Sequence, residues 1–353
     1  MKEDIYDQLV NKAINGEALS DDLCIKMFSD EVETLSLVES AYKVRKKFWG
    51  KEVLIHILNN VQNGQCSEDC YYCAQARVSK AEIVEYPMKP DEEIIAEAEE
   101  AYKKGAFRYC MVFSGRGPSK KRIEHLIRLI KTIKEKYKIE VCVSPGSIDE
   151  ADAKILKEAG LDRLNHNLNT SEKFYPKICS SHTYEQRIKT INAAMNVGLQ
   201  ICSGAIIGMG EETIDIINVA RDLNKYKVDS IPINFFIPIE GVSLDHTPLL
   251  SPEYCIRVLC LFRFLNPKAE IRVAAGRELY FGSLESMAFY PANSLFLEGY
   301  LNTKGQSSSR TLKMLKDAGF VIKSEYSLDE LLEKERLNIE MKEEKDLHPK
   351  KNR

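Results

Sequence analysis

VLIHILNNV (residues 53–61) and QCSEDCYYCAQ (residues 65–75) are the most informative segments of this 353-residue chain. The first is a run of β-branched and apolar residues, which is typical of a buried strand. The second follows almost directly and spaces Cys66, Cys70 and Cys73 as C-x₃-C-x₂-C. Because sites in α/β proteins lie in the loops after parallel strands, we expect these thiols to lie in a functional site.

Seven further strand-like segments follow the first one, and amphipathic helical stretches separate them. The eight predicted strands cover residues 53–61, 107–113, 139–144, 163–168, 199–207, 229–236, 269–275 and 293–298. Stretches such as SKKRIEHLIRLIKTIKEKY repeat apolar residues at the three- and four-residue spacing of helices. This alternation predicts an α/β fold, a TIM-type (β/α)₈ barrel, with a doubly wound open sheet as the alternative.

The chain is expected to have one catalytic domain with two extensions. Residues 1–50 are predicted to form an N-terminal helical extension, and residues 51–322 to form the barrel. Residues 323–353 are dense in charge and poor in aromatic residues, which indicates a charged C-terminal extension that is helical or disordered.

Composition narrows the possible partners and the compartment. The formal net charge of −3 gives no general reason to bind nucleic acid, and no apolar run approaches the roughly 20 residues that cross a membrane. The N-terminus lacks the pattern of a signal peptide, so we expect a cytoplasmic protein. Ten cysteines in such a chain should stay reduced, which favours metal ligands or catalytic thiols over disulfides.

The C-x₃-C-x₂-C segment predicts an iron–sulfur site. Three thiolates on one loop can hold three irons of a 4Fe–4S cluster and leave the fourth iron open. An amino group and a carboxylate can chelate that iron, as S-adenosylmethionine (SAM) does in radical SAM enzymes, which have this spacing. The alternatives are a zinc site or three unrelated thiols, but zinc sites usually have four ligands, and none completes this set locally.

Polar side chains are also predicted inside the barrel, where Val, Ile and Leu are usual. Strand alternation assigns each face and places His166 opposite Asn165 and Asn167. The predicted polar set is Cys110, Cys142, Cys202 and Arg272, with the amides Asn165, Asn167 and Asn234. One buried Cys alone would be an ordinary core residue. Three with an Arg indicate a second iron–sulfur cluster, and three amides can bind a ureido ring.

The chain resembles the biotin synthase family of the radical SAM superfamily across nearly the whole barrel. The segments that carry the resemblance are CSEDCYYCAQ, RYCMVFSG, VCVSPG, LNHNLNTS, ICSGAIIGMGE, IPINFF, IRVAAGRE and PANSLF. NHNLxTS, CSGxIxGxGE and RxxAGRE are far more specific than the cysteine triad.

The resemblance implies a role for each residue of the predicted site. Cys66, Cys70 and Cys73 would bind the 4Fe–4S cluster that cleaves SAM. Cys110, Cys142, Cys202 and Arg272 would hold an auxiliary cluster, 2Fe–2S in well-known members, with a four-iron variant also open. Tyr72, Asn169 and Ile206 would contact SAM. Asn165, Asn167 and Asn234 would contact the ureido ring of dethiobiotin.

The implied reaction is that of a sulfurtransferase. SAM is cleaved to methionine and a 5′-deoxyadenosyl radical, which removes hydrogen from dethiobiotin, and the auxiliary cluster donates sulfur to form biotin. The resemblance also implies a flavodoxin- or ferredoxin-type electron donor, dependence on the iron–sulfur assembly machinery, and a homodimer.

The chain departs from the family pattern at several places, among them FYPAN (residues 289–293), VFSG (residues 112–115) and the longer IEGVSLDHTPL (residues 239–249), and two single residues concern the site directly. Asn169 replaces an Asp associated with SAM, which should weaken charge-assisted contacts. Cys179 is an extra thiol, and we interpret it as an incidental loop residue, with a substitute cluster ligand or a repair thiol as alternatives. The competing functions are a maturase- or mutase-like radical SAM enzyme that inserts no sulfur, and a non-catalytic iron–sulfur carrier.

Overall fold

Eight strand positions close into a parallel barrel in the computed structural model, which describes residues 4–244, 247–301 and 303–336. The barrel strands are β1 (Glu52–Asn60), β2 (Arg108–Val112), β3 (Glu140–Ser144), β4 (Arg163–Asn165), β5 (Gln200–Cys202) with β6 (Ala205–Ile207), β7 (Ser230–Phe235), β8 (Glu270–Val273) and β9 (Ser294–Phe296). Every neighbouring pair is parallel, and β9 pairs with β1 to close the ring. The eight predicted strands and the TIM-type barrel are therefore confirmed, and the open sheet is wrong.

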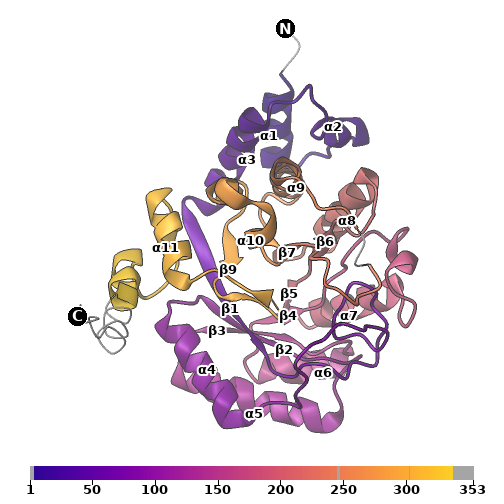
Figure 1. Cartoon of the computed structure of the whole chain (residues 1–353), viewed down its shortest axis with the longest axis vertical. Coiled ribbons are helices and arrows are strands. Elements are labelled where there is room, and N and C mark those ends of the chain that lie inside the picture. Colours follow the sequence, from indigo (N-terminus) through magenta and orange to yellow (C-terminus); the bar gives the residue numbers. More distant parts are fainter. Residues whose placement is uncertain (1–3, 245–246, 302, 337–353) are drawn as a thin grey trace, which may run out of the picture.

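Helices surround the barrel, as Figure 1 shows. They are α4 (Asp91–Lys103), α5 (Lys120–Lys136), α6 (Glu150–Glu158), α7 (Tyr184–Asn196), α8 (Thr213–Lys225), α9 (Pro252–Leu265), α10 (Arg277–Tyr280) and α11 (Ser308–Asp317), with 3₁₀ turns η1 (Tyr175–Lys177) and η2 (Gly282–Phe289). Side-chain caps fix several starts: Ser119 caps α5, and Thr183 forms a capping box with Gln186 on α7. No described helix is both long and apolar enough to cross a membrane.

The predicted fifth strand is split in two by a close backbone contact. A β-carbon on Gly204 would lie 1.8 Å from the carbonyl oxygen of Pro232, so only glycine fits there. Pro232 in β7 also has no N–H to donate to a sheet. The chain therefore leaves the ladder between Cys202 and Ala205, beside the site.

Among the described residues, three helices precede the barrel in the sequence, and short strands follow it. The helices α1 (Ile5–Asn15), α2 (Asp21–Lys26) and α3 (Thr34–Trp49) precede it, and α1 and α3 pack against α9 (Figure 1). A hairpin of β10 (Gly299–Tyr300) and β11 (Thr303–Lys304) follows β9, and β12 (Val321–Ile322) pairs with β1. Residues 337–353 of the predicted charged tail lie outside the described residues, and the three-part division stays a prediction.

Candidate active site

A cavity of about 300 Å³ opens at the carboxyl ends of the strands and brings together much of the predicted site. Its lining includes Cys66, Cys70, Cys73, Tyr72, Asn165, Asn167, Asn169, Ile206 and Asn234. These residues come from the loop after β1 and from the β4, β6 and β7 regions. Cys110, Cys142, Cys202 and Arg272 do not line it but lie deeper in the barrel, as described below.

The cysteine loop, residues 65–75, is held by two buried acids. Asp69 accepts hydrogen bonds from the backbone N–H groups of Ser180 and Ser181 at 3.0 and 2.9 Å. Glu68 lies 2.7 Å from both the Ser181 hydroxyl and Nδ1 of His182. Burial would raise the pKa of Asp69, but the hydrogen bonds from the Ser180 hydroxyl and from the two backbone N–H groups hold it below its usual range. The loop is thus fixed against the segment that follows η1.

The residues predicted to contact SAM lie together beside this loop. The Asn169 amide donates to the Tyr72 hydroxyl at 2.7 Å, and the Ile206 N–H donates to the Asn169 carbonyl at 2.7 Å. Asn169 has a φ of 71°, a left-handed conformation that asparagine adopts more readily than most residues. The following turn is closed by Glu211, whose carboxylate accepts from the N–H groups of Gly208 and Met209.

The three predicted amides line one side of the cavity, and part of their capacity is used within the protein. Asn165 donates to the Cys202 carbonyl and thiol, both at 3.3 Å, and to Oδ1 of Asn167 at 3.2 Å. The Asn234 amide bonds to the backbone of Ala205 and Ala275. Among the described residues, Oδ1 of Asn165 and Nδ2 of Asn167 have no partner, so an acceptor and a donor remain for a ligand.

Three buried thiols form a separate cluster beneath the amides. Cys110, Cys142 and Cys202 group with Ala274 and Phe296, apart from the main apolar core. Cys110 and Cys142 are directly opposite each other on β2 and β3, and Asn165 is opposite Cys202. The inward position predicted for these three cysteines on β2, β3 and β5 is confirmed. All ten cysteines are free thiols, so no disulfide competes for these sulfurs.

Arg272 connects the thiol cluster to a buried acid. Its guanidinium lies 3.6 Å from the Cys202 sulfur, 2.8 Å from the Ser230 hydroxyl and 2.5 Å from the Glu270 carboxylate. The hydrogen bond from Cys142, together with the charge of Arg272, lowers the pKa of the Cys202 thiol to about 5 against the effect of burial. The environment therefore favours a thiolate at Cys202, the form that binds iron, while hydrogen bonds with Cys110 and Cys202 raise the pKa of the Cys142 thiol.

Glu270 is the centre of a charged network at the bottom of the cluster. It is fully buried and contacts Arg108, Arg163, Arg272 and His56. Burial alone would raise its pKa, but the charges of Arg272, His56, Arg108 and Arg163 hold that pKa well below the usual range. One carboxylate faces three guanidinium groups, and Glu140 also pairs with Arg108. This leaves positive charge beneath the thiols, which suits an anionic thiolate cluster.

Sequence reasoning missed His56 and Glu270 and misplaced His166. Glu270 could have been found from the sequence, because it lies two residues before Arg272 and therefore on the same face of β8. Nothing in the sequence distinguished His56, which lies in an apolar strand. His166 lines the cavity with Asn165 and Asn167 instead of facing away, because β4 ends at Asn165 and strand alternation stops there. Cys255 and Cys260 are fully buried in α9, as expected of core residues.

The residues present fit iron–sulfur clusters at both predicted positions. Cys66, Cys70 and Cys73 line an open cavity, where a ligand could reach an iron that they leave free. At the deeper position, Nε of Arg272 is buried without a hydrogen-bond partner among the described residues. An unpaired buried donor beside three thiols is costly unless an acceptor binds there.

Comparisons with known proteins agree with this chemistry. Residues 62–223 match the Radical SAM superfamily model, and residues 232–321 match the model of the Biotin and Thiamin Synthesis associated domain. The chain is 52% identical to a biotin synthase of Acaryochloris marina over 86% of this chain and 88% of that one. It is 50% identical to a biotin synthase of Magnetococcus marinus over 89% and 98%.

Solved structures share the fold at low identity. A methylornithine synthase has a TM-score of 0.76 at 20% identity, covering 88% of this chain and 96% of that one. The FeFe-hydrogenase maturase from Carboxydothermus hydrogenoformans has a TM-score of 0.76 at 18% identity, covering 93% and 81%. These likenesses concern the fold alone. The relatives at half identity over most of their length show that the chain belongs to the biotin synthase family of radical SAM enzymes.

Proposed function

We propose that this chain inserts sulfur into dethiobiotin to form biotin, using SAM and a sulfur-donating auxiliary cluster. The observation that carries the proposal is the contact between Asn165 and Cys202, which joins a polar ligand cavity to a cluster of three buried thiols. A maturase- or mutase-like enzyme without sulfur insertion would not need that thiol cluster. An iron–sulfur carrier would not need the cavity.

The ligand assignments follow the positions of the side chains. Cys66, Cys70 and Cys73 would hold the 4Fe–4S cluster at the cavity mouth. Cys110, Cys142, Cys202 and Arg272 would hold the auxiliary cluster. When bound, the clusters and SAM supply an electron, a 5′-deoxyadenosyl radical and the sulfur atom. Tyr72, Asn169 and Ile206, which lie together in the cavity, would bind SAM.

The amides would recognise the substrate by matching its hydrogen-bonding groups. A ureido ring offers N–H donors and one carbonyl acceptor. The unpartnered Oδ1 of Asn165 can accept from a ring N–H, and the unpartnered Nδ2 of Asn167 can donate to the ring carbonyl. Asn234 is tied to Ala205 and Ala275, so it would serve mainly to fix the shape of the pocket.

Arg272 and Glu270 would prepare the deeper position for a negative group. Arg272 is oriented by Glu270 and Ser230 and lies beside the Cys202 thiol. Its position is fixed by the fold before any ligand binds, so little reorganisation is needed when a cluster enters. Phe296 and Ala274 pack around the thiols and exclude water from them.

The proposed reaction also requires protein partners that supply electrons and clusters. Reductive cleavage of SAM needs a one-electron donor, for which a flavodoxin- or ferredoxin-type protein is suitable. Iron–sulfur assembly proteins would supply both clusters. A homodimer and a cytoplasmic location stay predictions from the family resemblance and from the sequence.

An anaerobic assay of the reconstituted chain with SAM, a reductant and dethiobiotin tests the proposal. Mass spectrometry would quantify biotin and 5′-deoxyadenosine. We expect biotin from the parent chain, and 5′-deoxyadenosine without biotin from Cys142→Ala. Cys255→Ala is the matched control, because Cys255 is an equally buried thiol in α9 away from the site. Deoxyadenosine without biotin from the parent chain would contradict the proposal and favour a radical SAM enzyme of another reaction.

A further inference from the structure

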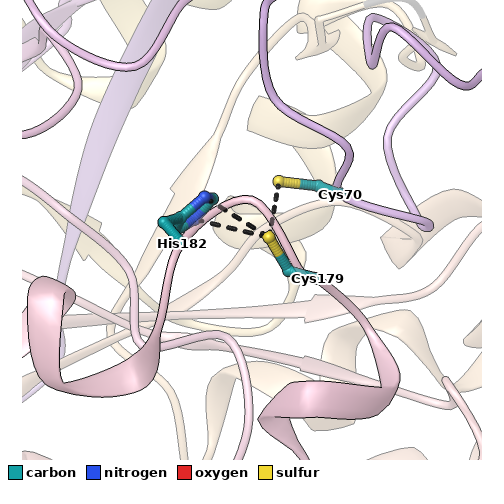
Figure 2. Close-up of side chains that lie close together, drawn as sticks. All are labelled: Cys70, Cys179 and His182. Carbon is teal, nitrogen blue, oxygen red and sulfur yellow. Dashed lines mark hydrogen bonds between the residues drawn. The ribbon is translucent and has the colours of Figure 1, made fainter.

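Cys179 contacts Cys70 of the cysteine loop and His182, and both of these partners line the cavity. Its sulfur is 3.9 Å from the Cys70 sulfur and 3.3 Å from Nδ1 of His182. Figure 2 shows how the three side chains lie toward one another. The donor atoms of the three residues all lie within 4.8 Å of one another. Cys179 is only 3% exposed and does not line the cavity, so it is not placed to contact SAM or substrate.

From this geometry we infer that Cys70, Cys179 and His182 form a mononuclear site for a borderline divalent cation such as Zn²⁺ when the 4Fe–4S cluster is absent. With Zn–S near 2.3 Å and Zn–N near 2.0–2.1 Å, two sulfurs on a tetrahedral zinc lie about 3.8 Å apart, and a sulfur and a nitrogen about 3.6 Å apart. The observed separations of 3.9 and 3.3 Å are close to these values, whereas the Cys70 sulfur and His182, which lie within 4.8 Å of each other, would have to move closer together as the cation binds. A disulfide would require the sulfurs to approach to about 2.05 Å.

The surrounding residues hold His182 in one tautomer, which has to change when a cation binds. Arg187 lies 2.7 Å from Nε2 of His182 and donates to it, so Nδ1 carries the ring proton and donates it to Glu68. Binding through Nδ1 moves that proton to Nε2 and ends the Arg187 donation. Arg187 keeps its bonds to Tyr175 and to the Asn167 carbonyl. The two thiol protons leave to solvent, and water takes the fourth position on the metal.

The mononuclear cation and the 4Fe–4S cluster would compete for the sulfur of Cys70. Cys70 cannot serve a mononuclear cation and the 4Fe–4S cluster together, so the zinc-loaded chain should not load that cluster. Only this exclusion rests on the assignment of Cys70 to the cluster. The cation site itself follows from the positions of the three side chains and is independent of the sulfur-insertion reaction.

The test uses the full chain, freed of clusters and reduced under anaerobic conditions, with Co²⁺ as a spectroscopic probe and Zn²⁺ as its competitor. We expect one Co²⁺ per chain with thiolate-to-metal charge-transfer absorption and intense tetrahedral bands. Cys179→Ser and His182→Asn should each weaken Zn²⁺ binding by more than the roughly 10- to 100-fold that losing an outer hydrogen-bond partner causes. Cys73→Ser is the matched control, because it removes a loop thiol outside the trio and should keep the spectrum.

A second experiment uses the unsubstituted chain, so its result does not depend on whether a variant folds. Compared with the zinc-free chain, one equivalent of Zn²⁺ should slow alkylation of Cys70 and Cys179 together, measured by peptide mass spectrometry, while the reactivity of Cys66 stays unchanged. Equal loss of Co²⁺ binding in Cys73→Ser and Cys179→Ser would overturn the inference, because the loop triad would then hold the metal. Unchanged affinity in Cys179→Ser, or protection of Cys66 with Cys70, would also overturn it.

Discussion

Nδ2 of Asn165 lies 3.3 Å from the sulfur of Cys202, and the two residues are register partners on β4 and β5. This hydrogen bond is where the ligand cavity meets the buried thiol cluster. A group held by the free Oδ1 of Asn165 would therefore lie within a few bond lengths of the thiols. The relationship depends on the register between two strands and not on a flexible loop, so it is fixed by the fold.

Asn165→Ala should weaken binding of dethiobiotin. The change removes the Oδ1 acceptor and also the hydrogen bond to the Cys202 sulfur. Losing a buried hydrogen bond costs about 1–3 kcal/mol, which corresponds to roughly a 5- to 150-fold increase in KM for dethiobiotin. Uncoupled formation of 5′-deoxyadenosine should remain. Asn196→Ala on α7, whose amide bonds to Glu150 at the surface, is the control and should behave as the parent chain.

Arg272→Met should prevent retention of the auxiliary cluster while the triad cluster still loads. The substitution keeps much of the side-chain volume but removes the guanidinium beside Cys202. If the auxiliary cluster is 2Fe–2S, the iron content after reconstitution should fall by about two per chain. Iron and sulfide analysis would measure this. Full iron content in Arg272→Met would show that the three thiols hold the cluster without Arg272.

Glu270→Gln should destabilise the fold far more than Glu140→Gln. Both acids pair with Arg108, but the Glu270 side chain is 1% exposed and that of Glu140 is 34% exposed. Removing the acid leaves three buried guanidinium groups poorly paired, which costs about 3–5 kcal/mol in the free energy of unfolding. Denaturant unfolding of equally loaded proteins would compare the two variants.

The pH dependence of the Glu270 contribution follows from the direction of its pKa shift. Since its folded-state pKa is held well below the usual range, the stabilisation is fully present above the unfolded-state pKa of about 4.3. It is lost as the pH falls further, toward the folded-state pKa. The stability difference between the parent chain and Glu270→Gln should thus be constant between about pH 5 and 8 and shrink below about pH 4. A difference that shrinks already near pH 6 would contradict the direction of the shift.

Much of the architecture could be predicted because it depends on local pattern. Runs such as residues 53–61 and 139–144 are apolar and β-branched, and the helices between them have clear periodicity. The break at Gly204 could not be predicted, because it depends on the carbonyl of Pro232 in another strand. Likewise, Cys70 and Cys179 are 109 residues apart in sequence, and only the folded chain shows that they touch. The C-x₂-H spacing of Cys179 and His182 was the one local signal of that cluster.

Gly204→Ala should destabilise the protein and disturb the site, although a methyl group is a small change. The added carbon would meet backbone of β7 at 1.8 Å, and backbone cannot move aside as a flexible side chain can. We expect a loss of about 1–3 kcal/mol or more, measured by thermal or denaturant unfolding. Gly16→Ala is the control, because nothing lies within 4 Å there and only the cost of its left-handed conformation applies. Equal losses in both variants would mean that the contact with Pro232 relaxes easily.

Asn169→Asp should tighten SAM binding, because it restores the acid usual in the family at a position where the structure accepts either side chain. Asparagine and aspartate both tolerate the left-handed φ of 71° at this residue, and the Tyr72 hydroxyl can donate to a carboxylate as readily as it accepts from the amide. Charge-assisted hydrogen bonds are roughly twice as strong as neutral ones, so we expect the Kd for SAM to fall about 3- to 10-fold. Anaerobic equilibrium dialysis of the cluster-loaded protein would measure the Kd.

Asn169→Ala is the comparison variant. It loses the polar group and also places alanine at positive φ, so SAM binding and stability should both decrease. Weaker SAM binding in Asn169→Asp than in the parent chain would indicate that residue 169 contacts a part of SAM that prefers an amide donor.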